Sequence, residues 1–405
     1  MPTRFPISNI DYSEFQPCDS LHELLASNEN SIHTLEESQS IHTPPPWDYG
    51  GQIDTFLNNP RGDDDHLPES WWEQPIITPA AYAVNLKNGI AIGGRINRRN
   101  IPEELFQVRH EGGQLLLTEQ KELIPDSYLR YRSLPIDLLE VISEDEIYLR
   151  DPLNSVRKET GRFLLLGNFS MNHFGHMIIE SLARLWPVLE IDLSQIQLVV
   201  YQSELNSDAI QYLKALNIAV DQIYFLTEPT QFENLIVPSS PYLLHRQNSP
   251  LMDRIWRKIG RSFPPAEHSP ERIYISRSRF KKWRNLENEE AVEQLFSSRG
   301  FEIVHPQELP LNQQISLIRA ADHVAGCTGS GSYSCAFSEK KLKQLILAPH
   351  TFVYRDDPLI TYFKGGHTDF FLSNETIQDE RGPRYPDWNL PIDKLDHAVE
   401  AWLES

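Results

Sequence analysis

The chain has 405 residues, of which 40% are hydrophobic and 23% charged, a composition that is typical of a globular protein and excludes wholesale disorder. Its net charge of −20 excludes a general nucleic-acid binder, and its three cysteines exclude a disulfide framework or a zinc-binding pattern. No apolar run approaches the roughly 20 residues of a membrane span, and the first residues lack the layout of a signal peptide. We therefore expect a cytoplasmic protein, free or peripheral to the membrane.

Residues 1–80 carry most of the negative charge, with fourteen acids against two bases. The segment is polar and contains many prolines, and a short helix is predicted only at residues 21–25. Such a composition does not favour an independent core. We therefore expect residues 1–80 to form an acidic accessory arm outside the main body of the protein.

After residue 80 the pattern becomes that of β-strands. Apolar residues alternate on both sides of Asn88 and Gly89, a dipeptide typical of two-residue turns, so a β-hairpin is predicted there. A second hairpin is predicted between residues 106–108 and 115–117.

Beyond residue 161, strands alternate with helices in two sets that are separated by a proline-containing link. In the first set, strands are predicted at 162–166, 198–201, 223–226 and 235–237, and helices at 173–189 and 207–216. In the second set, strands are predicted at 272–276, 301–304, 323–325 and 343–348, and helices at 253–261, 287–298 and 311–321. A helix that contains Leu395, Val399 and Trp402 closes the chain.

This alternation predicts an α/β fold, because parallel strands are joined by helices that cover the faces of their sheet. We expect two Rossmann-like lobes with a cleft between them. The N-terminal lobe, which includes the hairpins, is predicted over residues 81–245. The C-terminal lobe is predicted over residues 246–390, and residues 391–405 form the closing helix.

A glycine-rich loop, GCTGSG at residues 326–331, follows the predicted strand at 323–325. Glycines let a backbone approach a ligand closely, and the start of the next helix favours phosphate. The spacing is neither that of a P-loop nor GxGxxG, so a tight turn between strand and helix remains the alternative. The candidate ligand contacts are Thr328, Gly329, Ser330 and Gly331.

A basic island at residues 254–284 holds ten bases and two acids within this acidic chain. Arg277 lies in it directly after the predicted strand at 272–276, flanked by Ser276 and Ser278. A guanidinium group can bind a diphosphate through two parallel hydrogen bonds, and the serine hydroxyls can add donors. The alternative is a solvated basic loop.

A third candidate site lies at the start of the helix predicted at 173–189. His176 and Glu180 are four residues apart and share one helical face, where a carboxylate can tune the histidine into a base. Asn172, His173 and Arg184 are candidate orienting or acceptor-binding groups. The alternative is a histidine at a helix start with an ordinary ion pair between Glu180 and Arg184.

Together these segments resemble glycosyltransferase family 61, the DUF563 proteins associated with capsular polysaccharide biosynthesis. The first matching block runs from Asn172 to Trp186 and is similar to the family pattern N-x-x-x-H-x-x-x-E-x-x-x-R-x-W. The second block starts at Ile273 and runs through Arg277 to the glycine-rich loop, so the likeness covers residues 162–349. Family members typically carry a histidine in this loop, at the position that Thr328 occupies here.

The resemblance implies a GT-B fold and an inverting transfer of a hexosyl or pentosyl group from a nucleotide-sugar, with uridine diphosphate as the expected carrier. The donor is held mainly by the C-terminal lobe, and the acceptor is a hydroxyl of a glycan, a protein or a small molecule. No cofactor and no metal are implied, which agrees with the lack of an Asp-x-Asp motif in the matching region. His176, or Glu180 itself, would act as the base opposite a leaving diphosphate that Arg277 stabilises.

Two other readings remain open at this point. A sugar-nucleotide epimerase of similar two-lobed architecture would use the same kinds of residue without an acceptor. A non-catalytic relative that binds a nucleotide or a glycan is the other reading, and Thr328 in the loop favours it. The sugar, the acceptor and the oligomeric state are left open, with a homo-oligomer as one outcome.

Overall fold

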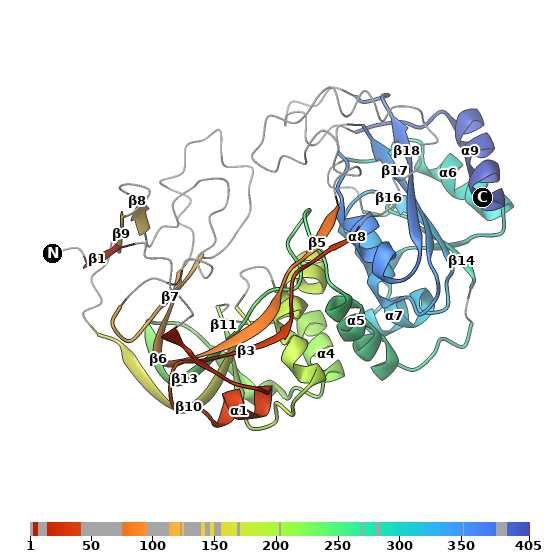
Figure 1. Cartoon of the computed structure of the whole chain (residues 1–405). Helices are drawn as coiled ribbons and strands as arrows, with labels where there is room; N and C mark the ends of the chain where they lie inside the picture. The colour runs from red at the N-terminus through yellow and green to blue at the C-terminus, as the bar shows by residue number, and fades with distance from the viewer. Residues whose placement is uncertain are drawn as a thin grey trace. The chain divides into compact units, whose positions relative to one another are not determined.

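The computed structural model in Figure 1 describes residues 3–6, 14–41, 75–94, 113–121, 124, 139–141, 146–149, 155–167, 171–201, 204–268, 270–280, 284–350, 352–377 and 387–405. The chain divides into two compact units. Unit 1 comprises Met1–Ser38 and Ala80–Pro241, and unit 2 comprises Gln39–Pro79 and Tyr242–Ser405.

Unit 1 is built on a mixed sheet whose strands lie in the order β12-β11-β10-β13-β6-β3-β2. Its parallel part comprises β10 (Arg157–Leu165), β11 (Gln197–Val200), β12 (Ile223–Phe225) and β13 (Thr230–Pro238). Its other strands are β6 (Ala81–Gly94), β3 (Ser31–Glu36), β2 (Gln16–Pro17) and β7 (Gly113–Leu117). Because β11 and β12 extend to one side of β10 and β13 lies on the other, the strand order reverses between β10 and β13.

The carboxyl-terminal end of β10 and most of β11 are apolar and buried in the sheet of unit 1. Phe163 of β10 packs between two aromatic side chains, with ring centroids 4.5 Å from Phe232 and 5.7 Å from Tyr224. Helix α4 (Ser207–Ala215) joins β11 to β12, and a 3-10 turn, η7 (Val220–Gln222), precedes β12. The alternation of strands and helices predicted beyond residue 161 is therefore observed in this unit.

Part of the N-terminal segment lies in unit 1. Strand β3 pairs antiparallel with β6, and α1 (Leu21–Ala26), which begins after Ser20, buries Leu21 and Leu24. Residues 16–36 of the expected accessory arm thus contribute strands and a helix to the unit 1 sheet. In unit 2, β4 (Gln39–Ile41) pairs with β5 (Ile76–Thr78), and residues 42–74 lie outside the described residues. A small antiparallel sheet comprises β1 (Thr3–Pro6), β9 (Glu146–Leu149) and β8 (Leu139–Val141).

The hairpin predicted at Asn88 and Gly89 is wrong. These residues lie inside the single long strand β6, which pairs with β13 in the same register on both sides of Asn88. Asn88 adopts a φ of +54°, so its turn preference survives only as a local left-handed conformation. The ladder along β13 outweighs the local preference for a turn. Strand β7 also pairs with β6, and its predicted partner at residues 106–108 lies outside the described residues.

Unit 2 contains a parallel sheet with the strand order β15-β14-β16-β17-β18. The strands are β14 (Arg272–Ile275), β15 (Glu302–Val304), β16 (His323–Cys327), β17 (Lys343–Pro349) and β18 (His367–Ser373). The α-helices are α5 (Pro250–Ser262), α6 (Glu289–Ser298), α7 (Leu311–Ile318), α8 (Asp356–Phe363) and α9 (Ile392–Glu404), with 3-10 turns η8 (Pro306–Glu308) and η9 (Ser330–Phe337). In this sheet the strand order reverses between β14 and β16.

The predicted elements of the second set are observed, and α8 and β18 are additions that the sequence pattern did not indicate. The closing helix is confirmed as α9, which buries Leu395, Val399 and Trp402 in a core shared with α6 and the sheet. The chain is thus an α/β protein. Within the described part of the chain, no helix combines the length and the apolar character that crossing a bilayer requires.

Candidate active site

The first predicted site lies on a helical segment of unit 1 that follows β10. The segment comprises α3 (Phe174–His176), a π-helical turn η5 (Met177–Ser181) and a 3-10 stretch η6 (Leu182–Leu189). It begins beyond the carboxyl end of β10, beside β13, where the strand order reverses and ligands of open α/β sheets bind. The helix predicted at 173–189 is confirmed, but it contains a π turn, a feature frequent at functional sites.

His176 and Glu180 are brought together by this segment. The imidazole Nδ1 of His176 hydrogen-bonds to the Oε2 atom of Glu180, and each side chain is only 19% exposed. A carboxylate at Nδ1 fixes the orientation of the ring and stabilises its protonated form. The pair therefore has the geometry of a histidine that can accept a proton at its opposite nitrogen.

His173 lies beside this pair, with its ring centroid 4.7 Å from that of His176. Burial lowers the pKa of His173 to about 4, and the neighbouring charge of His176 acts in the same direction. His173 is therefore neutral near pH 7. Its side chain caps the helical segment by accepting a hydrogen bond from the backbone N–H of His176.

Asn172 and Arg184, two of the predicted orienting residues, bind the backbone of unit 1. The Nδ2 atom of Asn172 donates to the carbonyl of Glu204 at 3.1 Å, and its Oδ1 atom accepts from the N–H of Asn206 at 2.8 Å. Arg184 donates from Nη1 to the carbonyl of Pro238, at the end of β13, at 2.7 Å. These contacts hold both ends of the helical segment in place, which a positioned base requires.

The second predicted site forms where β14 and β16 lie side by side in unit 2. Arg277 follows β14 and donates from Nη1 to the carbonyl of Thr328 at 3.2 Å, in the loop that follows β16. A Cβ atom on Gly326 would lie 2.9 Å from the carbonyl oxygen of Ile275, so this glycine is needed for strand packing. Gly329 has a φ of +135°, and a Cβ atom there would lie 2.6 Å from Nη1 of Arg277. The loop thus approaches the guanidinium more closely than any side chain would allow.

The hydroxyls of Ser276 and Ser278 are directed to helix α6. Ser276 donates to Oε1 of Glu293 at 2.5 Å, and Ser278 donates to the same oxygen at 2.6 Å. The backbone N–H of Arg277 donates to Oε1 of Glu289 at 2.6 Å, and burial raises the pKa of Glu289. These contacts fix the loop that carries the arginine. The donor-binding role of Ser276 and Ser278 stays a prediction. The two acids on α6, Glu289 and Glu293, are four residues apart, and this spacing is the sequence signal that could have indicated them.

The rest of the glycine-rich loop is held by its own backbone. Thr328 donates its N–H to the carbonyl of Leu347 at 2.8 Å, which extends the pairing of β16 with β17. Ser332 donates from its hydroxyl to the carbonyl of Gly329 at 2.8 Å. Ser330 and Gly331 are the first residues of η9. The free backbone N–H groups at the N-terminus of a helix favour anions.

The basic island carries less free charge than its composition indicates. Three of its arginines are paired with acids: Arg257 with Asp253, Arg261 with Glu339, and Arg279 with Glu308. Among the residues that the structure describes, no group of three or more His, Cys, Asp or Glu side chains is arranged to hold a metal ion.

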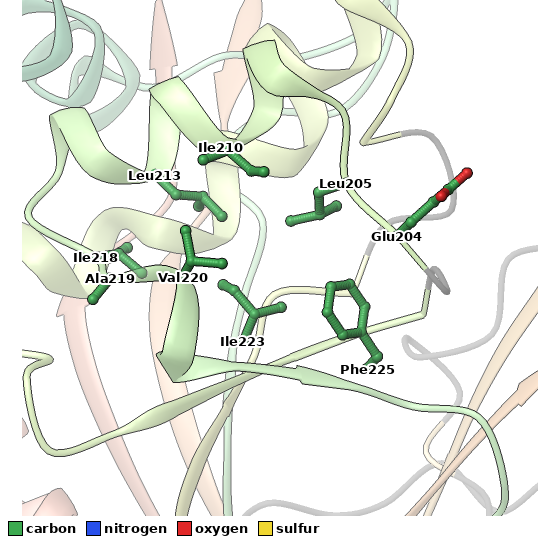
Figure 2. A pocket seen from close by; sticks show the side chains of 9 residues that line it. All are labelled: Glu204, Leu205, Ile210, Leu213, Ile218, Ala219, Val220, Ile223 and Phe225. Atoms are coloured by element: carbon green, nitrogen blue, oxygen red, sulfur yellow. The ribbon is translucent and has the colours of Figure 1, made fainter.

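An apolar cavity of about 230 Å³ lies in unit 1 between α4 and β12, and Figure 2 shows its lining. Glu204, one of its lining residues, accepts at its carbonyl the hydrogen bond from Asn172. The side chains that line it are Glu204, Leu205, Ile210, Leu213, Ile218, Ala219, Val220, Ile223 and Phe225. No sequence pattern indicated it, because its lining is scattered along residues 204–225 and only Leu213 and Ile218 of it are buried.

A histidine–carboxylate pair and an arginine set against a glycine-rich loop thus each lie beyond the carboxyl ends of parallel strands, where open α/β sheets bind ligands. Residues 174–346 match the family model Glycosyltransferase 61, and the matched region contains His176, Glu180, Arg277 and the loop. The match supports the resemblance to glycosyltransferase family 61 over this region of the chain. No curated protein matches the chain.

Proposed function

We propose that the protein transfers a sugar from a nucleotide-sugar, with uridine diphosphate as the carrier, to an acceptor hydroxyl with inversion and without a metal. The observation that carries this proposal is the hydrogen bond between Arg277 and the carbonyl of Thr328. It sets a guanidinium against a glycine-rich loop at the place where the strand order of the unit 2 sheet reverses. Ligands with phosphate groups bind at such places.

In this proposal Arg277 and the first amides of η9 bind the donor diphosphate. As the bond from the anomeric carbon to the diphosphate oxygen breaks, negative charge grows on that oxygen, and fixed donors stabilise it. A guanidinium suits this role, because it stays charged and binds two oxygens at once. Glu289 and Glu293 support the site indirectly by fixing the backbone and the two serines around Arg277.

His176 is the proposed base, and Glu180 is its partner. The acceptor hydroxyl gives its proton to the ring nitrogen opposite Nδ1 while its oxygen forms the new bond to the anomeric carbon, on the face opposite the diphosphate. Glu180 then faces the imidazolium and stabilises it. If Glu180 itself takes the proton, His176 instead orients the substrate, and mutation of each residue separates these roles.

Metal independence is supported by the residue set, since the matched region lacks an Asp-x-Asp motif. A GT-B arrangement is part of the proposal, because one transfer needs both the histidine of unit 1 and the arginine of unit 2. It follows that a variant in either unit alone should abolish turnover.

The test is an assay of nucleotide release from a panel of UDP-sugars, with and without hydroxyl acceptors. Acceptor-dependent release of UDP by the wild type, and its loss in Arg277→Ala, is the expected result. The variant should also bind UDP about tenfold to a hundredfold more weakly, because a hydrogen bond to a charged group contributes about 1.5–3 kcal/mol. Conversion of the sugar without an acceptor would identify an epimerase. Activity that needs manganese after chelation would overturn metal independence.

A further inference from the structure

His245 of unit 2 lies on the segment between β13 and α5 and adopts a strained backbone. Its φ is +61°, in the left-handed region that only a few per cent of residues other than glycine occupy, with asparagine, aspartate and histidine the most frequent among them. Its imidazole stacks on the ring of Tyr354, with centroids 4.2 Å apart and planes inclined by 8°. Such strain persists only where the surroundings fix it, and it is concentrated at functional sites.

Asp356, the first residue of α8, holds this histidine. Its carboxylate is fully buried and accepts hydrogen bonds from Tyr242 Oη at 2.7 Å, Tyr333 Oη at 3.0 Å and the backbone N–H of His245 at 2.9 Å. It also binds the Nδ1 atom of His245. Burial acts to raise the pKa of Asp356, but the charge of His245 and these hydrogen bonds hold it below its ordinary value. A buried ionised carboxylate in turn stabilises the imidazolium form of its partner.

His245 lies at the same edge of the sheet as Arg277. The guanidinium of Arg284, in the loop that follows β14, lies 3.8 Å from the ring centroid of Phe352, in the loop that follows β17. Phe352 contacts Tyr354 at 4.6 Å, and Tyr354 stacks on His245. Because β16 lies between β14 and β17, these two loops meet across the carboxyl end of β16, from which the glycine-rich loop departs.

Helix η9, which follows the glycine-rich loop directly, adds a second link to this edge. Its Tyr333 donates to Asp356, so the carboxylate that holds His245 is tied to the helix that begins at Ser330. The side chain of His245 is 14% exposed, so its ring reaches the surface there, whereas that of Asp356 does not.

We propose that His245 is a second ligand of the donor diphosphate and that Asp356 positions its ring for this contact. The proposal rests on the proposed function and adds a contact to it. As the glycosidic bond breaks, its electron pair goes to the diphosphate oxygen, and the Nε2–H of the His245 imidazolium donates a hydrogen bond to the diphosphate. The acceptor proton still goes to the base in unit 1, so His245 ends the step with its proton.

The local charge permits an anion at this position. Asp357 is the acid next to Asp356, and burial raises its pKa to about 7, which reduces its negative charge at neutral pH. The negative charge of Asp356 is paired with His245, and Arg355 precedes Asp356 in the chain. The site is therefore not dominated by the two adjacent acids.

The test is His245→Asn, with UDP and UMP binding measured by calorimetry. Asparagine tolerates a positive φ and keeps an amide N–H for Asp356, but it lacks the far ring nitrogen and the charge. We expect the affinity for UDP to fall about tenfold to a hundredfold, because a charge-assisted hydrogen bond is lost. The affinity for UMP, which lacks the second phosphate, should change much less.

His268→Asn is the matched control, because His268 also faces a carboxylate in unit 2, that of Glu302, but is exposed. It should bind both nucleotides as the wild type does. His245→Gly, which has no strain at a positive φ, is the second variant if His245→Asn unfolds at a lower temperature.

Four outcomes would overturn the inference. Equal losses for UDP and UMP would show a structural role for His245, and unchanged UDP affinity would show no role in binding. If Arg277→Ala weakened UDP binding and both His245 variants did not, only this inference would fail. A wild-type protein that binds neither nucleotide would refute the proposed function and this inference with it.

Discussion

The variant Gly329→Ala tests whether UDP binding depends on the close approach of the glycine-rich loop to Arg277. In Gly329→Ala the added Cβ atom would lie 2.6 Å from Nη1 of Arg277, at a φ of +135°. Ordinary contact begins at 3.4 Å, so the guanidinium or the loop must move by about 0.8 Å. We expect such a movement to weaken the hydrogen bond from Arg277 to the carbonyl of Thr328, now at 3.2 Å.

Two costs follow from this geometry. Gly329 has a ψ of 175°, so it lies in a region that only glycine ordinarily occupies, and a residue with a Cβ atom there costs roughly 1–3 kcal/mol. Displacement of Arg277 removes a charge-assisted hydrogen bond worth about 1.5–3 kcal/mol. We therefore expect a modest loss of thermal stability and a fall of about tenfold to a hundredfold in UDP affinity, measured by thermal unfolding and calorimetry.

Gly161→Ala separates the two costs. Gly161, in unit 1, has a φ of +108°, but no atom lies within 4 Å of the position that its Cβ would take. This variant should lose stability through backbone strain and keep its UDP affinity. If Gly329→Ala bound UDP as the wild type does, the argument that the loop and Arg277 form one binding site would be refuted.

Three further predictions concern the base, the buried acid pair and the N-terminus. Either His176→Ala or Glu180→Gln should reduce turnover by about 10²–10⁴ with UDP affinity retained, and near wild-type turnover in both would place the base elsewhere. Burial raises the pKa of Asp357 from 3.8 to about 7, so the folded state binds its proton more tightly and stability is lost as the pH rises across that range. Asp357→Asn should reduce this loss between about pH 4 and about pH 7 in thermal unfolding, and an unchanged slope would contradict the assignment. Removal of residues 1–41 should lower the unfolding temperature, because the sheet loses β3 and the unit 1 core loses the buried Leu24; an unchanged temperature would show that this segment adds no stability.

Much of the fold could be predicted because buried parallel strands are short apolar runs between helical patterns. Strands β14 and β16 are examples, and each is followed directly by residues that indicated a ligand. Helix α8 was missed because it starts with two acids and a proline, which resemble a surface loop, although both acids are buried. The order of strands in the two sheets, which decides where the strand order reverses, depends on pairing that local patterns do not encode.

The candidate site was predictable only where its residues are neighbours in the sequence. His176 and Glu180 are four residues apart, so helical geometry alone brings them together. His245 and Asp356 are separated by 111 residues, and only the fold makes them a pair. The orientation of Ser276 depends on Glu293 of α6, so the sequence indicated a hydroxyl near the site but not the carboxylate to which it donates.

The two units are interleaved along the chain, and this affects how the protein can be synthesised and divided. Gln39–Pro79 belongs to unit 2, yet it is translated between two pieces of unit 1. Strand β6 of unit 1 pairs with β13, whose residues follow about 140 positions later in the chain. Neither unit can complete its fold on the ribosome before most of the chain has been synthesised. No single break in the chain separates the two units intact. A split enzyme would therefore need breaks on both sides of residues 39–79, with that segment supplied alongside the C-terminal piece.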